Sequence, residues 1–385
     1  MPKRTSGEGT IYQRPDGLWR AEITLGYDGD GKRKKKVFSS MDLETVQKKV
    51  NDFKYKLDRN VAVQKSDYTV YEWAVFWLEK YKLHGLKAKT YDSYEFSLNR
   101  HIKDAIGGIK LDRLKADTVQ GFYNSLHEKG LGSTTIHIVH TVLSQAYDQA
   151  IKNELVYLNP CRATSRPRKE KKQVVAFTRQ EQQAFVKGLG GSGYHLLFAF
   201  LLNTGLRVGE ARALTWEDVD FENRLVIVNK TVSDVKNRDE DPATKMRAVV
   251  TSTKTAHGER QVPLNKIACE VCAVQKSRDL NDILVFSSKA GTMIQERNIN
   301  RSLKALLENL RFQKKFTVHS LRHSFATRLM EKGVNPKVVS ALLGHASVQI
   351  TLDLYSHAMP EMKSKAVGLL DELGNEPITT ALPHL

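Results

Sequence analysis

The chain has 385 residues, 41% of them hydrophobic, which is enough for two or three domains with buried cores and excludes a wholly disordered protein. Lysine and arginine number 60 against 43 acidic residues, so the formal net charge is +17. Such an excess of positive charge is typical of proteins that bind nucleic acid, with a merely basic protein as the alternative.

Three cysteines are too few for the disulfide framework of a small secreted protein, and their odd number does not allow all of them to pair. Cys269 and Cys272 have the spacing of metal ligands, but no second Cys or His pair follows, so we interpret them as ordinary helix residues. The longest apolar run, 196–202, is too short to span a bilayer, and the N-terminus lacks the apolar core of a signal peptide. We therefore expect a cytoplasmic protein without membrane contact.

Residues 1–60 predict a small three-stranded sheet backed by one helix. Strand patterns occupy 9–13, 18–27 and 32–39, and apolar residues then recur at helical spacing from 43 to 57. The basic residues of this segment that are expected outside the core and available to DNA are Arg20, Lys32, Arg33, Lys34, Lys35 and Lys36. For the run 32–36, a solvated hairpin tip is the alternative.

Residues 66–164 predict a compact helical bundle. Thr69 is placed to cap its first helix, and further helices are expected over 89–101, 117–128 and 133–153. We interpret the aromatic residues of this bundle as core rather than as platforms for stacking bases.

A basic linker, 165–173, follows the bundle. Its Arg166, Arg168 and Lys169 are candidates for phosphate contacts, although plain spacing is the alternative. Residues 174–375 mix helices with a few strands, and 376–385 predict a loose tail. The expected fold class is therefore multidomain and mainly helical with small sheets (α+β).

The large unit carries polar residues where its predicted segments end. An apolar helix ends at Gly205, and the next begins near Arg207, where free backbone N–H groups favour an anion. Glu210 lies on the same helical face and can hold Arg207. Residues 249–264 predict two short strands around an Ala-His-Gly turn, with Lys254 near the tip.

Two more segments follow the same pattern. His319 and Arg322 share one face of a helix whose other face is apolar. The next helix starts at Asn335-Pro336 and ends at Gly344, which places His345 directly beyond it. A final short helix, 348–356, carries Tyr355.

Taken singly, each of these residues has an ordinary explanation, but together they suit chemistry on a phosphodiester. Two guanidinium groups can bind the non-bridging oxygens of one phosphate, and cationic neighbours favour the phenolate of a tyrosine. Neither a Mg²⁺ carboxylate cluster nor a glycine-rich phosphate loop is visible. We therefore expect phosphoryl chemistry that uses no metal, nucleotide or other cofactor.

This set resembles the signature of the tyrosine recombinases, the phage integrase family. The matching motifs, in chain order, are Thr-Gly-Leu-Arg207-xx-Glu210, Thr-Lys254-Thr, His319-xx-Arg322-His323, Leu-Leu-Gly-His345 and Thr-Leu-Asp-Leu-Tyr355-Ser-His. The bundle is similar to the core-type DNA-binding domain of that family. The N-terminal sheet resembles the arm-binding domain of integrases from Gram-positive phages and conjugative transposons. A long polar excursion, 234–247, departs from the family pattern and weakens the assignment of Lys254.

The resemblance implies a site-specific recombinase that integrates and excises a mobile element, without metal or ATP, through a 3′-phosphotyrosyl link formed by Tyr355. It implies charge stabilisation by Arg207, Arg322 and His345. Lys254 is the implied general acid and His319 the residue that assists at the tyrosine, with Glu210 as support.

The implied partners are double-stranded attachment sites of core and arm type, further copies in a homo-tetramer, an excisionase and a host DNA-bending protein. The protein would then be associated with the nucleoid when active. Three rival functions are a type IB topoisomerase, a catalytically silent DNA-binding accessory protein and an RNA-binding protein. The added N-terminal sheet argues against the first, the complete set of competent residues against the second, and the lack of an RNA-binding motif against the third.

Overall fold

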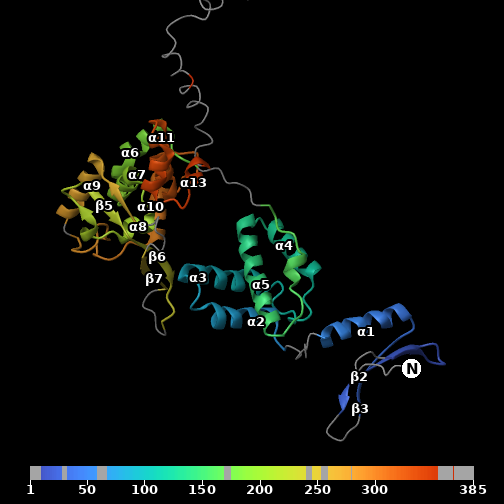
Figure 1. Ribbon diagram of the computed structural model, residues 1–385. Helices are drawn as coiled ribbons and strands as arrows, with labels where there is room; N and C mark the ends of the chain where they lie inside the picture. The colour runs from blue at the N-terminus through green and yellow to red at the C-terminus, as the bar shows by residue number, and fades with distance from the viewer. Residues whose placement is uncertain are drawn as a thin grey trace, which may run out of the picture. The chain divides into compact units, whose positions relative to one another are not determined.

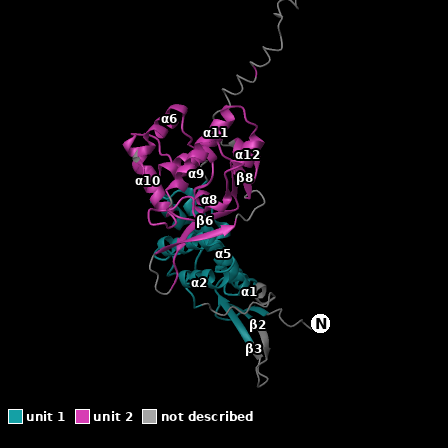
Figure 2. Ribbon diagram, turned by 90° about the vertical axis from the view of Figure 1, so that its left-hand side faces the viewer, with its two compact units in different colours: residues 1–170 teal, residues 171–385 magenta. Residues whose placement is uncertain are grey.

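The computed structural model consists of two compact units, residues 1–170 and 171–385 (Figure 2). Within the described part of the chain, no helix combines the length and the apolar character needed to cross a membrane. The structure describes residues 10–27, 33–58, 67–168, 175–239, 245–252, 259–278, 280–353 and 367.

The first unit begins with the expected antiparallel sheet, in the order β1-β2-β3 (Figure 1). Its strands and following helix are β1 (Thr10–Gln13), β2 (Trp19–Tyr27), β3 (Arg33–Ser40) and α1 (Leu43–Asp58). Ala21 and Ile23 of β2 and Val46 and Val50 of α1 are buried against one another. The alternation read from the sequence thus selects the face of the sheet that α1 covers.

A helical bundle with its own core completes this unit. Thr69 caps its first helix, because the Thr69 hydroxyl accepts from the Glu72 backbone N–H while the Glu72 carboxylate accepts from the Thr69 backbone N–H. The elements are α2 (Val70–Trp77), α3 (Ala88–Ser97), α4 (Ala116–Glu128) and α5 (Ser133–Lys152), with π-helical turns at Leu78–Lys82 and Leu98–Ile102 and a 3-10 turn at Pro160–Ala163.

Most of the large aromatic residues of the bundle belong to its core, as expected, whereas Tyr68, Tyr81 and Phe96 are exposed. Trp73 is buried and donates its indole N–H to the Ala146 carbonyl at 2.8 Å. Tyr147 is also buried and donates its hydroxyl to the Leu111 carbonyl at 3.0 Å. Their polar atoms are therefore satisfied inside the protein, as buried aromatic residues require.

The first part of the expected linker lies against the bundle instead of running free. The Ser165 backbone N–H donates to the Gln120 side chain at 2.8 Å, and the Pro167 carbonyl lies 3.0 Å from His137 Nε2. Arg166 and Arg168 remain exposed, and residues 169–173 lie outside the described residues.

The second unit packs helices around two small sheets (Figure 1). Its helices are α6 (Arg179–Gly188), α7 (His195–Thr204), α8 (Val208–Ala213), α9 (Lys266–Ser277), α10 (Glu296–Asn309), α11 (Val318–Glu331), α12 (Pro336–Leu343) and α13 (Val348–Asp353), with 3-10 turns at Leu189–Gly191 and Trp216–Asp218. One sheet has the order β4-β5-β8, and the other consists of β6 and β7. The strands are β4 (Val219–Asp220), β5 (Leu225–Val228), β6 (Lys230–Lys236), β7 (Met246–Ser252) and β8 (Arg260–Pro263).

The pairing predicted for 249–264 was wrong. β7 pairs with β6, from Lys230 opposite Ser252 to Lys236 opposite Met246, whereas β8 pairs with β5. The two ends of the polar excursion at 234–247 thus belong to the paired strands β6 and β7, which β-branched cross-strand pairs such as Val232 with Val250 stabilise, and residues 240–244 lie outside the described residues. The strands on either side of Lys254 consequently belong to different sheets, and Lys254 itself lies outside the described residues.

Helix α8 is fixed to this hairpin at two points. A Cβ at Gly209 would lie 2.6 Å from Thr231 Oγ1 and 2.7 Å from the Val232 carbonyl, so only glycine permits this close approach. Arg212, which is fully buried, donates to Asp234 of β6 and, at 2.6 Å, to the Ile294 carbonyl. The start of α8 is therefore held rigidly against the rest of the unit.

Helix α7 ends at Gly205, whose φ of +66° lies in the left-handed region. A Cβ there would lie 2.4 Å from Phe325 Cδ1 of α11 and 2.9 Å from Leu343 Cδ2 of α12. Gly205 is therefore required both by backbone conformation and by the close packing of three helices.

We expect Gly205→Ala to lower the free energy of unfolding by ~2–4 kcal/mol, because it adds left-handed strain to a clash with two packed side chains. Gly193→Ala is the matched control, since a Cβ at Gly193 meets no atom within 4 Å. Chemical denaturation of the two variants measures the difference. Equal stabilities would contradict this description of the helix junction.

Candidate active site

Arg207 and Glu210 form a reciprocal pair at the start of α8. Arg207 is the N-cap residue, and its backbone N–H donates to Glu210 Oε2 at 2.8 Å while its Nη1 donates to Glu210 Oε1 at 2.7 Å. The Glu210 side chain is only 2% exposed, whereas that of Arg207 is 41% exposed. Glu210 thus orients Arg207 from the inside, while part of the Arg207 side chain remains exposed.

Three arginines converge on the last carbonyl groups of α12, a helix that ends at Gly344. Arg260 Nε donates to the Leu342 carbonyl at 2.7 Å, and Arg322 Nη2 donates to the Leu343 carbonyl at 2.6 Å. Arg207 Nη2 donates to the Gly344 carbonyl at 3.0 Å. The end of a helix has unsatisfied carbonyls and the negative end of the helix dipole, so guanidinium groups are favourable there.

Arg322 of α11 is 2% exposed and connects two helix ends. Its Nη1 donates to the Gly205 carbonyl at 2.8 Å, in addition to the Nη2 bond to Leu343. Burial and then the nearby charge of Arg207 lower the pKa of Arg322 to about 9, so the guanidinium is still protonated at neutral pH. A fixed group that is charged at neutral pH suits the binding of a phosphate oxygen.

The histidines of the site are held neutral. His319 and His323 of α11 contact each other with ring centroids 4.4 Å apart. Burial, followed by the charges of Arg322 and Arg207, lowers the pKa of His319. Burial lowers the pKa of His323 to about 3, with His319 as the next cause. It also lowers the pKa of His345 to about 4, with Arg322 and Arg207 as further causes.

His345 is oriented by the segment that follows it. Its Nδ1 lies 2.8 Å from the hydroxyl of Thr351, which is fully buried on α13. When Thr351 donates to Nδ1, the Nε2–H of the neutral ring remains available to a ligand. Thr351 stands four residues before Tyr355, so α13 connects the histidine to the segment of the tyrosine in sequence.

The described part of this cluster contains three guanidinium groups against one carboxylate, that of Glu210. Burial by itself raises the pKa of Glu210, but the hydrogen bonds and charges of Arg260 and then Arg207 outweigh it and lower that pKa below its ordinary value. Glu210 is therefore ionised, and the cluster keeps an excess of two positive charges. Such a site favours an anion.

The structure brings together Arg207, Glu210, His319, Arg322 and His345, five residues predicted from the sequence. The remaining two, Lys254 and Tyr355, lie outside the described residues. No group of three His, Cys, Asp or Glu side chains that could hold a metal ion occurs among the residues that the structure describes.

Two further residues of the site were missed in the sequence. Arg260 donates to both oxygens of Glu210, at 3.2 and 2.8 Å, and Thr351 orients His345. A signal for Arg260 was present, because Arg260 and the buried Val262 are two residues apart in one strand and therefore share its inner face.

The expected DNA contacts of the N-terminal sheet are divided between its faces. Arg20 and Lys35 lie around Glu22, with Arg20 Nε 3.3 Å and Lys35 Nζ 3.0 Å from its carboxylate. Lys36, in contrast, pairs with Ile23 on the face that carries the core. Lys35 and Lys36 are therefore not presented as one patch, because successive strand residues point to opposite faces.

The other predicted contacts are only partly described. Arg33 and Lys34 belong to β3, but their side chains are outside the description, as are residues Lys32 and Lys169 altogether.

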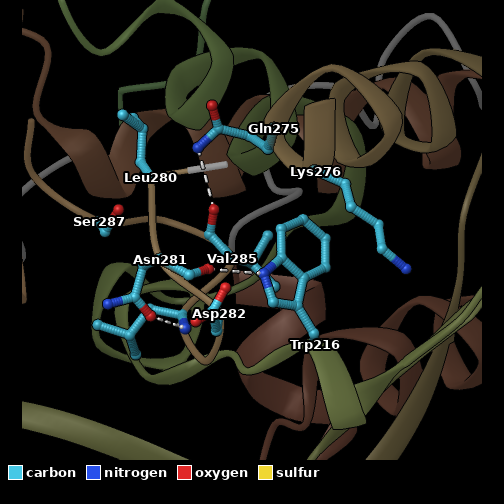
Figure 3. Close-up of a pocket in the computed structure, with 9 residues that line it drawn as sticks. Trp216, Gln275, Lys276, Leu280, Asn281, Asp282, Val285 and Ser287 are labelled. Carbon is cyan, nitrogen blue, oxygen red and sulfur yellow. Dashed lines mark hydrogen bonds between the residues drawn. The ribbon is translucent and has the colours of Figure 1, made fainter. Parts of the chain in front are cut away.

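A surface cavity of about 270 Å³ lies elsewhere on the second unit (Figure 3). Its lining includes Trp216 and Gln275 but none of the residues of the arginine cluster. Trp216 Nε1 donates to the Asn281 carbonyl at 3.2 Å, and Gln275 Nε2 donates to the Val285 carbonyl at 3.0 Å. These polar atoms thus hold the adjacent loop and serve the scaffold.

Two segments of the chain match models of one protein family. Residues 193–362 match the phage integrase family, and residues 69–127 match the N-terminal SAM-like domain of phage integrases. A tyrosine recombinase XerC-like protein of Caldanaerobacter subterraneus is 28% identical over 377 residues, covering 92% of this chain and 96% of the relative. The transposase of transposon Tn916 from Enterococcus faecalis is 29% identical over 287 residues, covering 68% of this chain and 69% of that protein.

Solved structures are similar over most of the chain. The Tn1549 transposon integrase in complex with a circular intermediate DNA has a TM-score of 0.65 at 23% identity, covering 77% of this chain and 99% of the solved one. A lambda integrase dimer bound to a core site has a TM-score of 0.59 at 18% identity, covering 92% and 96%. At these identities the similarity shows a shared fold.

The lowered histidine pKa values predict that acid destabilises the folded protein. In the unfolded chain a histidine titrates at about pH 6.5, whereas His345 and His323 stay neutral in the folded protein down to about 4 and about 3. Between the pKa of a histidine in the unfolded chain and its lower pKa in the folded protein, the unfolded chain binds more protons than the folded protein does. The free energy of unfolding therefore falls as the pH is lowered through this range.

Urea denaturation at about pH 7.5 and about pH 5 measures this loss. His323→Gln removes one of the titrating groups and should reduce the loss, whereas His84→Gln, at an exposed position of the bundle, should leave it unchanged. If both variants lost the same free energy of unfolding on acidification, His323 would not be a histidine whose pKa is lowered by folding.

Proposed function

The chain belongs to the phage integrase family of tyrosine recombinases, and on this premise we propose that it integrates and excises a mobile element by cutting and rejoining DNA strands. The proposed intermediate is a 3′-phosphotyrosyl link. Because this link conserves the energy of the phosphodiester, another 5′-hydroxyl can reseal the strand without ATP.

The observation that carries this proposal is the cluster of positive charge at the end of α12. A phosphodiester carries one negative charge, and the pentavalent transition state of its cleavage carries more. Arg207 and Arg322 would bind the non-bridging oxygens, and the neutral His345 would donate a further hydrogen bond. Stabilisation of developing charge by fixed donors is a large contribution, of the order of 10²–10³ in rate for one donor.

The proposed proton transfers involve three further side chains. The Tyr355 oxygen forms a bond to phosphorus while the bond from phosphorus to the 5′-oxygen breaks. The Tyr355 proton passes to His319, whose lowered pKa keeps it neutral and able to accept. The Lys254 ammonium gives its proton to the 5′-oxygen, which leaves as a hydroxyl.

Three parts of the chain are proposed to hold the DNA. Residues 66–164 would bind core-type sites as a helical domain, residues 1–60 would bind arm-type sites, and the linker 165–173 would contact phosphate through exposed Arg166 and Arg168. The catalytic domain would span 174–375, with 376–385 as a tail.

The proposed assembly is a homo-tetramer on paired attachment sites, at the nucleoid. A lambda integrase tetramer bound to a Holliday junction, a structure of similar fold, supports this arrangement. An excisionase and a host DNA-bending protein are the proposed accessory partners, because integration and excision need a device that sets their direction.

We expect Tyr355→Phe to abolish strand cleavage while the affinity for the site changes by less than about threefold, because the change removes the nucleophile and no positive charge. The substrate is a nicked duplex that carries the attachment site found at the junctions of the element. A denaturing gel detects the covalent adduct between protein and DNA.

Tyr194→Phe, in the same unit, is the matched control and should retain the adduct. An adduct that persists in Tyr355→Phe would place the nucleophile elsewhere. With the wild-type chain, joined products from two DNA molecules separate a recombinase from a topoisomerase, and the absence of any adduct would indicate a silent DNA-binding protein.

Deletion of residues 1–60 should leave cleavage of isolated core sites intact but impair recombination between complete attachment sites, because the bridge to arm-type DNA is lost. Binding of arm DNA by residues 1–60 should be weak and sensitive to salt, since Arg20 and Lys35 already share Glu22. Recombination assays with complete and core-only sites measure both effects. If the truncated chain recombined complete sites as well as the intact chain does, the proposal would be wrong, and the sheet would serve only to stabilise the protein.

A further inference from the structure

Arg260 is a buried charge next to the catalytic arginines. Its side chain is 7% exposed, and it reaches from β8 to both α8 and α12. Burial of a charged group costs free energy unless the charge is paired and its donors are satisfied. Arg260 meets this condition through the carboxylate of Glu210 and the carbonyl of Leu342.

Glu210 is shared between two arginines. Its Oε1 accepts from Arg207 Nη1 at 2.7 Å and from Arg260 Nη1 at 3.2 Å, while its Oε2 accepts from the Arg207 backbone N–H and from Arg260 Nη2, each at 2.8 Å. The orientation of Arg207 thus depends on a carboxylate whose own position depends on Arg260.

The second arm of Arg260 reaches the helix that precedes His345. Its Nε donates to the Leu342 carbonyl at 2.7 Å, two residues before the carbonyl that accepts from Arg207. One planar guanidinium therefore fixes the distance between the start of α8 and the end of α12. A lysine cannot reproduce this, because its single ammonium lacks the rigid fork of donors.

We propose that Arg260 is a positioning residue of the recombination reaction, which holds Arg207 and His345 in the orientation needed to bind one phosphate. Arg260 acts through Glu210 and through the last turn of α12 rather than by contact with DNA. The inference rests on the proposed function.

A change in the titration of Glu210 distinguishes this role from a merely structural one. The charged and titratable groups that face Glu210 are Arg207 of α8, Arg260 of β8, and Arg322 and His319 of α11. Burial raises the pKa of Glu210, and Arg260 is the largest of the influences that lower it. Loss of Arg260 should therefore let Glu210 protonate at a higher pH and deprive Arg207 of its charged acceptor.

The test compares Arg260→Gln and Arg260→Lys with the intact chain in single-turnover cleavage of the nicked attachment-site duplex. Arg260→Gln should cleave ~10- to 100-fold more slowly, the range expected for a misplaced catalytic group. Its affinity for the duplex should change by less than about threefold. Arg260→Lys should recover part of the rate, because it keeps the charge but not both contacts. Arg179→Gln, which removes an exposed arginine–glutamate pair of the same unit, should leave the rate unchanged.

The rate is then followed against pH. Arg260→Gln should lose activity on acidification at a higher pH than the intact chain, and this difference should vanish in a Glu210→Gln background. Because Arg260→Gln and Glu210→Gln both disturb the same Arg260–Glu210 interaction, the double variant should be no slower than the slower single variant.

Three results would overturn the inference while leaving the proposed function in place: Arg260→Gln cleaving at the wild-type rate, effects of the two substitutions that multiply, or an unshifted pH profile. If Arg260→Gln does not fold, Arg260→Lys and its pH profile decide the question on the same criteria. Failure of the intact chain to form any adduct would overturn the proposed function and this inference with it.

Discussion

The last carbonyl groups of α12 have no donor within their own helix, and the geometry of the site follows from how the chain satisfies them. Leu342, Leu343 and Gly344 each accept a hydrogen bond from a different arginine, supplied by β8, α11 and the start of α8. The carbonyls and the helix dipole both attract cations, so three positive charges that would repel one another are gathered in one turn. The buried carboxylate of Glu210 offsets part of that repulsion, and the remaining positive charge is available to bind an anion.

Much of this arrangement could be predicted because the helices end at local signals. Thr69 caps α2, Gly205 ends α7, Asn335 and Pro336 start α12, and Gly344 ends it, as their side chains or backbone preferences dictate. Arg207 and His345 stand at such ends, whereas Arg322 lies within α11, and the sequence motifs that contain the three residues indicated a common site. Their roles in the reaction remain a proposal.

The features that escaped prediction depend on contacts between distant segments. The predicted strand pairing was wrong because the sequence Ala-His-Gly between β7 and β8 is typical of a turn and so favours a local hairpin, whereas β7 pairs with β6 and β8 with β5. Arg260 was overlooked because its two partners, Glu210 and Leu342, come from elements far from it in sequence. The pairing of Arg20 and Lys35 with Glu22 likewise appears only when the strands are in register.

Because Arg207 and Arg322 also cap helices, their loss affects which residues persist when a gene of this family loses its function by mutation. Arg322 donates to the carbonyls of the buried residues Gly205 and Leu343, and Arg207 donates to the carbonyl of the partly buried Gly344. Loss of either side chain would therefore weaken the fold even in a copy that no longer cuts DNA. Selection for stability alone would then preserve these two arginines, which are proposed to be catalytic, long after activity had gone. The arginines of a degenerate relative would therefore be poor evidence of activity, and the identity of the residue at the position of Tyr355 would be the better diagnostic.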